Sequence, residues 1–75
     1  MRSFLDSRGR LWDAVVGRES WGRVVMIFVP ADGAGEVLEA PLAASGYEEA
    51  ERDLDAMDPL ALDELLARAA PKEIG

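Results

Sequence analysis

Carboxylates are the most abundant side chains in this chain that could do chemistry. The 75 residues contain 15 Asp plus Glu, and they contain no His and no Cys. The absence of those two types removes the commonest general base, the Ser-His-Asp arrangement, cysteine nucleophiles and thiolate metal sites. Paired carboxylates are therefore the general acid or base that this composition readily supports.

The carboxylates with helical spacing are Glu48 with Glu51 and Glu51 with Asp55. A working acid needs a pKa raised by burial or by a close like charge. The pattern places these residues on the solvated face of a surface helix, and a chain of this size has little depth for a pocket. The sequence therefore predicts that the protein is not an enzyme and has no catalytic residue.

Two other motifs fall short of a binding site. The segment 53–58 resembles an acidic calcium loop, but such a loop needs Gly at its sixth position, where this chain has Asp58 followed by Pro59. The turn Gly33-Ala34-Gly35 lacks the spacing of phosphate-binding loops, and Glu36 after it would repel a phosphate. We therefore expect no metal and no cofactor.

Arginines and tryptophans in the first 30 residues form the combination that small β domains use on single-stranded nucleic acid. This alternative nucleic-acid face consists of Arg8, Arg10, Trp12, Arg18, Trp21 and Arg23. A net charge of −7 opposes phosphate binding. The competing interpretation is that the tryptophans fill the open face of a sheet and the arginines pair with the chain's own acids. We therefore rank nucleic acid second.

The acids gather in the second half of the chain. Residues 1–30 carry five arginines and three acids, whereas residues 31–75 carry twelve acids and three basic residues. The partner-binding acidic face predicted there consists of Glu48, Glu49, Glu51, Asp53 and Asp55. Complementary charge speeds docking on a basic protein or protein complex, which predicts a non-enzymatic, regulatory interaction module. Simple solubility is the competing explanation for the charge.

A third hypothesis concerns the sheet. Val25, Ile27 and Val29 alternate with Val24, Met26 and Phe28, so both faces of this segment are apolar. One pair of helices covers one face of a sheet, and a second chain would then cover the other. A subunit of a homo-oligomer or hetero-oligomer is therefore left open by the sequence.

The first half has the alternation and turn residues of strands. The expected strands are Phe4–Leu5, Leu11–Val16, Val24–Val29 and Glu36–Leu42, with turns at 6–9 and 32–35. The second half changes to helical period. Ser45 with Glu48 matches a capping box, and Asp58-Pro59 is typical of a second helix start. We expect Pro71 to stop that helix.

These patterns predict one α+β domain, in which a small antiparallel meander of about four strands, SH3-like in curvature by analogy, is covered on one face by two short amphipathic helices. The expected division is a meander over 1–42, helices over 45–70 and a tail over 71–75. The predicted core is Phe4, Trp12, Val16, Val24, Met26, Phe28, Leu38, Tyr47, Leu54, Leu62, Leu65 and Leu66. No apolar run is long enough for a membrane span, and we expect a protein of the bacterial cytoplasm.

Overall fold

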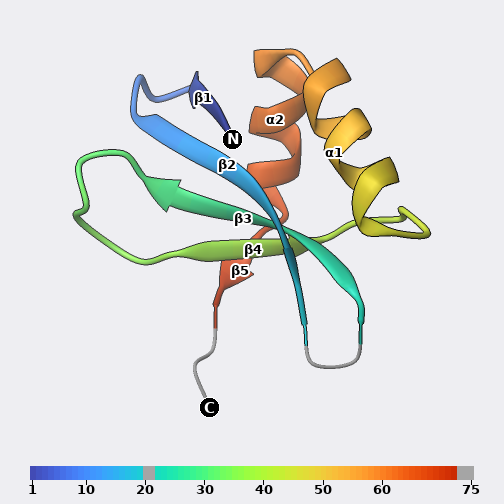
Figure 1. The fold of residues 1–75 in the computed structure, drawn as a ribbon. Helices are drawn as coiled ribbons and strands as arrows, with labels where there is room; N and C mark the ends of the chain where they lie inside the picture. The colour runs from blue at the N-terminus through green and yellow to red at the C-terminus, as the bar shows by residue number, and fades with distance from the viewer. Residues whose placement is uncertain (20–21, 73–75) are drawn as a thin grey trace.

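The computed structural model describes residues 1–19 and 22–72, and it has two layers (Figure 1). One layer is an antiparallel sheet with the strand order β1-β2-β3-β4-β5, and the other is a pair of helices. The elements are β1 (Arg2–Leu5), β2 (Leu11–Arg18), β3 (Val24–Pro30), β4 (Leu38–Pro41), α1 (Tyr47–Ala56), α2 (Pro59–Ala67) and β5 (Ala70–Pro71). The α+β prediction of a small meander and two helices is confirmed.

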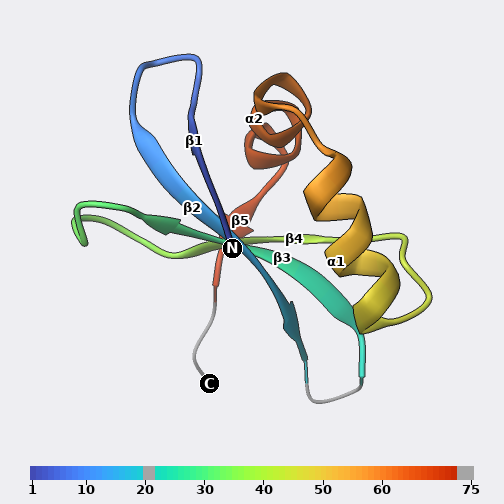
Figure 2. The same cartoon turned by 45° about the horizontal axis from the view of Figure 1, so that its top comes forward.

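Both helices lie on the same side of the sheet, as the two views in Figures 1 and 2 show. Helix α1 contacts β2, and α2 contacts β1 and β4. The two helices therefore bridge strands from the edge to the middle of the sheet. The opposite face of the sheet is the outer face, and none of the described elements packs on it.

The fifth strand, β5, is absent from the sequence prediction, which placed its residues at the end of the helical region and the start of a tail. Helix α2 ends at Ala67, and the chain then returns to pair antiparallel with β4. The backbone N–H of Lys72 donates to the Val37 carbonyl at 2.8 Å. Two residues are too few to show strand alternation, and Pro71 is tolerated there because β5 is an edge strand.

Strand β3 is the centre of the core. Met26 and Phe28 have no exposed surface, and their neighbours across the sheet include the small residues Ala14 and Ala40. Phe28 also meets Phe4 edge to face, with ring centroids 5.9 Å apart. Large side chains beside small ones let the sheet interdigitate with the helices at the density of a protein interior.

Most of the predicted core is confirmed. Nine of its twelve residues are buried, and Leu38, Tyr47 and Leu66 pack half-buried against the margin of the core. The prediction omitted the fully buried alanines at positions 14, 40 and 50, since an alanine contributes little to an apolar pattern.

The first helix starts differently from the capping box that pairs Ser45 with Glu48. The N-cap is Gly46, which offers no side-chain acceptor, and the reaching carboxylate is that of Glu49. It accepts from the Ser45 backbone N–H at 2.9 Å and also from the Ser45 hydroxyl. The predicted start is therefore one residue too early, and the helix begins at Tyr47, which packs against the margin of the core. The second start is confirmed, with Asp58 accepting from Ala61 N–H at 2.8 Å.

Truncation of Phe28 tests this core. We expect Phe28→Ala to lower the free energy of unfolding by about 3–5 kcal/mol. Removal of the ring leaves a cavity between the sheet and the helices, where the surrounding structure relaxes only in part. Urea denaturation followed by circular dichroism measures the change. Leu60→Ala is the matched control, since Leu60 is 66% exposed and its truncation should leave stability nearly unchanged. Equal stability of the two variants would contradict the core assignment.

Candidate functional site

Helix α1 places most of its charged side chains toward solvent. Ala50 and Leu54 are fully buried against the sheet, so the residues between them point away from it. Of the five acids predicted for partner binding, Glu48, Asp53 and Asp55 are exposed, whereas Glu49 and Glu51 are half-buried. The structure therefore divides the predicted acidic face into two groups.

Glu49 belongs to the fold. Its carboxylate accepts the hydrogen bonds from Ser45 that close the start of α1, and these bonds lower its pKa. A carboxylate in the first turn also interacts favourably with the partial positive charge at the helix N-terminus. Glu49 is therefore held in place, and it is not free to reorient toward a partner.

Glu51 lies beside an aromatic anchor. Tyr47 donates its hydroxyl to the Val16 carbonyl of β2 at 3.4 Å, and the Arg18 guanidinium lies 5.2 Å from the centre of the Tyr47 ring. The Glu51 carboxylate next to the hydroxyl raises the pKa of Tyr47. This cluster fixes the first turns of α1 to the end of β2, and a cation over an aromatic face adds to its stability.

The other end of α1 is held by Arg2. The last turn of the helix contains no basic residue, and the guanidinium arrives from β1 instead. It donates to the carbonyl of Leu54 at 2.9 Å and to that of Asp55 at 3.1 Å. A cation at this end satisfies helix carbonyls that have no partner within the helix and opposes the helix dipole. Sequence reasoning missed this contact, since 52 residues separate Arg2 from Leu54.

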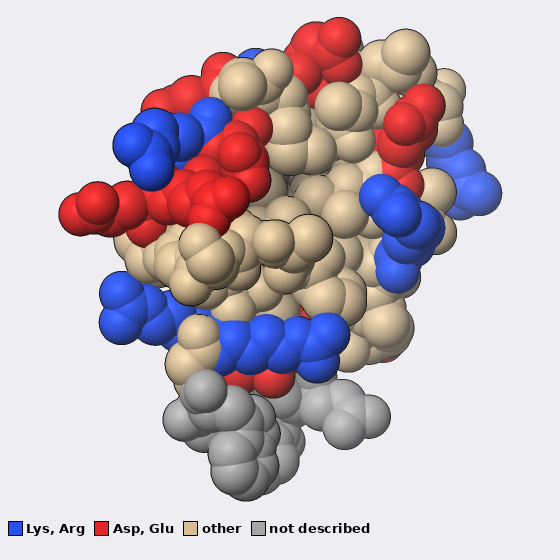
Figure 3. Space-filling model, turned by 90° about the vertical axis from the view of Figure 1, so that its right-hand side faces the viewer, with Lys and Arg blue, Asp and Glu red and all other residues tan. Residues whose placement is uncertain are grey.

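Glu48, Asp53 and Asp55 are the exposed acids of α1, and together we call them the α1 acidic surface. At 3.6 residues per turn, Glu48 and Asp55 share one side of the helix, and Asp53 lies on the other side of the exposed Arg52. In the part of the chain that the structure describes, the ion pairs within 4 Å are Arg10 with Asp32 and Lys72 with Glu39. Neither pair involves α1. Figure 3 shows carboxylates gathered on this side of the molecule, with basic side chains both between them and at their margin.

Trp12, a member of the alternative nucleic-acid face, is a core residue with 5% of its surface exposed. Its indole N–H donates to Asp6 Oδ2 at 2.9 Å. Arg10 stacks over the Trp12 ring at 4.9 Å and donates to the Ala34 carbonyl, with Asp32 at 3.7 Å. The ring is thus covered, and a nucleic-acid base has no access to it.

The arginines of that face lie at two separate places. Arg8 and Arg10 belong to the connection between β1 and β2, and Arg18 and Arg23 flank the connection between β2 and β3. Arg18 lies eight positions after Arg10 along β2, which corresponds to about 27 Å of extended strand. Within the described residues, the structure does not bring these arginines together, and Trp21 lies outside that range.

A hollow of about 270 Å³ lies between the β1–β2 turn and α2. Asp6 at its edge accepts from the backbone N–H groups of Arg8 and Arg10, both at 2.9 Å, as well as from Trp12. The Trp12 bond is the main cause of the lowered pKa of Asp6. Asp63 on the other side accepts from Ser7 N–H at 3.1 Å. Both carboxylates therefore hold the turn.

The described residues contain no group of three acids placed to hold a metal ion. Neither helix is long and apolar enough to cross a membrane. No protein-family model, curated protein or solved structure matches this chain. A proposal for its function therefore depends on the geometry of its own surfaces.

The Asp6 turn gives a pH prediction. Because the folded pKa of Asp6 is lowered, its charged form stabilises the fold above its unfolded pKa of about 3.9, and this stability is lost as pH falls through the folded pKa. We expect Asp6→Asn to cost about 1 kcal/mol at neutral pH, since the one amide oxygen can replace only one of the two acceptor oxygens and the NH2 group then faces an N–H donor. Urea denaturation at neutral and strongly acidic pH measures both effects.

The difference between the wild type and Asp6→Asn should shrink in acid. Glu36→Gln, at an exposed carboxylate, is the control and should behave like the wild type at both pH values. A constant difference across the pH range would show that the Asp6 charge does not hold the turn.

Proposed function

We propose that this chain is a non-enzymatic, regulatory interaction module whose α1 acidic surface docks on a basic protein. The observation that carries the proposal is the placement of Glu48, Asp53 and Asp55. They are exposed on a helix that is fixed at both ends, and no basic side chain of the described residues pairs with them within 4 Å. Unpaired exposed charge on a rigid element is available to a partner at small entropic cost.

The spacing on α1 defines what a partner would present. Glu48 and Asp55 are seven residues apart, which is about 10 Å along the helix axis. A matching surface carries Lys or Arg side chains over a similar length. The net charge of −7 extends the attraction beyond direct contact and increases the association rate at low ionic strength.

Basic side chains within and beside the surface add specificity. Arg52 is exposed on α1 one turn from both Glu48 and Asp55, and Arg18 lies over Tyr47 at the first turn of the helix. A partner with uniform positive charge would meet these arginines as well as the carboxylates. A partner whose positive centre has acids beside it fits better, because like charges in contact penalise wrong partners and wrong registers.

Solubility is the competing explanation for the exposed acids, and it predicts a different effect of moving the charges. A solubilising charge acts through its number, whereas a docking surface depends on position. Variants with equal net charge and different positions therefore separate the two. Glu49 should be left intact in these variants, since it closes the start of α1.

The test compares two double charge reversals. Glu48→Lys with Asp53→Lys changes the α1 acidic surface, and Glu36→Lys with Glu64→Lys changes two exposed acids elsewhere. We expect the first pair to abolish capture of a basic protein from a lysate of the source cells. The second pair should retain capture, because Glu36 and Glu64 lie outside the α1 acidic surface. It is a matched control, because both variants have the same net charge. Quantitative mass spectrometry of the captured proteins at low and high salt is the measurement.

Two outcomes would count against the proposal. One is an unchanged capture profile for the α1 variant, and the other is equal loss in both variants. Arg10→Ala with Arg23→Ala should leave protein capture unchanged. If the wild type binds single-stranded DNA and this pair abolishes the binding, the nucleic-acid alternative replaces the proposal.

A further inference from the structure

The hollow between the β1–β2 turn and α2 has two kinds of wall. One wall is apolar and consists of Trp12, Leu38, Leu66 and Ala67. The other wall is polar and consists of Asp6, Ser7, Arg8 and Asp63. Pockets of about 300–1,000 Å³ hold drug-sized ligands, and this hollow measures about 270 Å³. Its size therefore suits one side chain of another molecule.

Asp63 has acceptor capacity that the fold does not use. A carboxylate can accept about four hydrogen bonds on its two oxygens. Asp6 accepts three, from two backbone N–H groups of the turn and from the Trp12 indole. Asp63 accepts one, from Ser7 N–H to Oδ1, and within residues 1–19 and 22–72 no hydrogen bond or ion pair reaches its Oδ2. Asp63 is half-buried, so a hydrogen bond to that oxygen would be stronger than one in open water.

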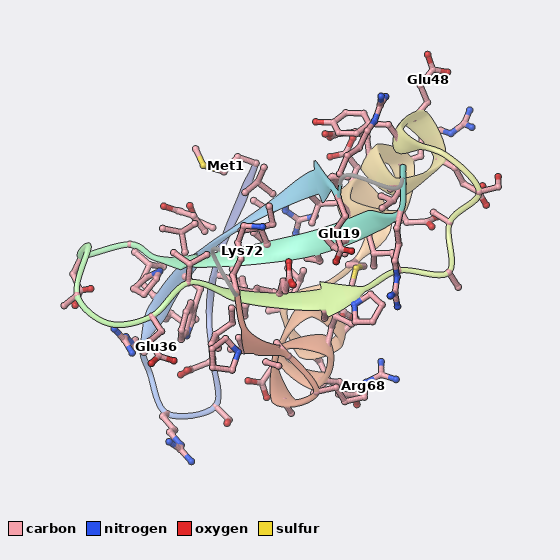
Figure 4. All side chains as sticks on the ribbon, turned by 90° about the horizontal axis from the view of Figure 1, so that it is seen from below. Met1, Glu19, Glu36, Glu48, Arg68 and Lys72 are labelled. Carbon is pink, nitrogen blue, oxygen red and sulfur yellow. The ribbon has the colours of Figure 1, made fainter. Side chains whose placement is uncertain are left out.

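The cations around the hollow leave Asp63 unpaired. Arg10 is engaged elsewhere, with the Ala34 carbonyl and Asp32. Arg68 lies at the end of α2, and Figure 4 shows its side chain directed away from the β1–β2 turn. Arg8 is exposed and forms no ion pair within 4 Å in the described part of the chain. Two carboxylates and one guanidinium give the lining a net charge of −1, which favours a cation.

A cation on an aliphatic stem matches both walls. The stem would pack on Leu38 and Leu66, and the charged head would reach Asp63. A guanidinium fits better than an ammonium, because it is more weakly hydrated and carries five N–H donors in one plane. The Ser7 hydroxyl on the same wall offers a second acceptor beside Asp63 Oδ2.

We propose that this hollow binds an arginine side chain of another protein. The guanidinium donates to Asp63 Oδ2 and to the Ser7 hydroxyl, and the methylene groups lie on the apolar wall. An arginine held in a pocket is a common energetic anchor of protein interfaces. No residue of α1 lines the hollow, so this site is separate from the α1 acidic surface and does not depend on it.

A short peptide tests the site. The probe is acetyl-Gly-Arg-Gly-amide, titrated into the 15N-labelled protein and followed by two-dimensional NMR. We expect the largest shifts at the backbone N–H groups of Ser7 and Asp63 and at the Trp12 indole N–H. The control peptide carries citrulline, which has nearly the same shape and no charge. Its affinity should be at least about tenfold lower, because hydrogen bonds between charged groups are the stronger ones.

Three variants separate the hollow from general attraction by charge. Asp63→Asn removes the charge but keeps an oxygen for Ser7 N–H, so the turn should stay native while the affinity falls at least about tenfold. Glu64→Gln removes the same charge from the exposed neighbouring residue and should keep the wild-type affinity. Ala67→Phe fills the hollow from its exposed end without a change in charge and should abolish the shifts. The NMR spectrum of each variant reports whether it is folded.

Four results would overturn the proposal. The first is the absence of shifts at Ser7 and at the Trp12 indole when the arginine peptide reaches millimolar concentration. The second is equal affinity for the citrulline peptide, and the third is an equal effect of Asp63→Asn and Glu64→Gln. The fourth is tighter binding of free arginine than of the peptide, which would assign the hollow to a small metabolite.

The same titration distinguishes this site from the α1 acidic surface. Glu48→Lys with Asp53→Lys should retain the peptide shifts at Ser7 and at the Trp12 indole. Shifts confined to α1 would reject the arginine site and leave the proposed function standing. Loss of protein capture in the α1 variant together with retained peptide binding would support both proposals.

Discussion

The packing of one face of the sheet against the two helices is the interaction on which the rest of this structure depends. Met26 and Phe28 of β3 are sealed by Leu54 of α1 and Leu62 of α2, and these contacts form the core. Small chains bury a limited share of their surface, so the side chains that do pack between sheet and helices carry most of the stability. Among the described residues, both helices lie on one face of the sheet.

Charged residues in this fold serve two different purposes. Asp6, Asp58 and Glu49 accept hydrogen bonds from backbone or indole N–H groups and hold turns and helix starts. Arg2 donates hydrogen bonds to the carbonyls at the end of α1 and holds that end of the helix. Once these groups are set aside, the carboxylates of the α1 acidic surface remain exposed without an internal partner among the described residues. The proposed function depends on that distinction and not on the acidity of the whole chain.

The two sides of the molecule differ in chemistry. The α1 acidic surface lies on the helical layer, and the outer face of the sheet carries Val15, Ile27 and Val29 beside Asp13 and Glu39.

The sequence by itself determined the meander, the two helices, the Asp58 helix start and most of the core, because these follow from local periodicity and turn chemistry. Only the tertiary structure decided which charges are free. Arg2 donates to the Leu54 carbonyl because helix packing brings these distant residues together. The Trp12 indole donates to Asp6 and stacks under Arg10 because strand pairing places them side by side. The tertiary structure also revealed β5, whose two residues form a strand because they pair with β4 and not because of their own sequence pattern. Local propensity carries no information about such contacts, since their energy depends on what the rest of the chain places beside them.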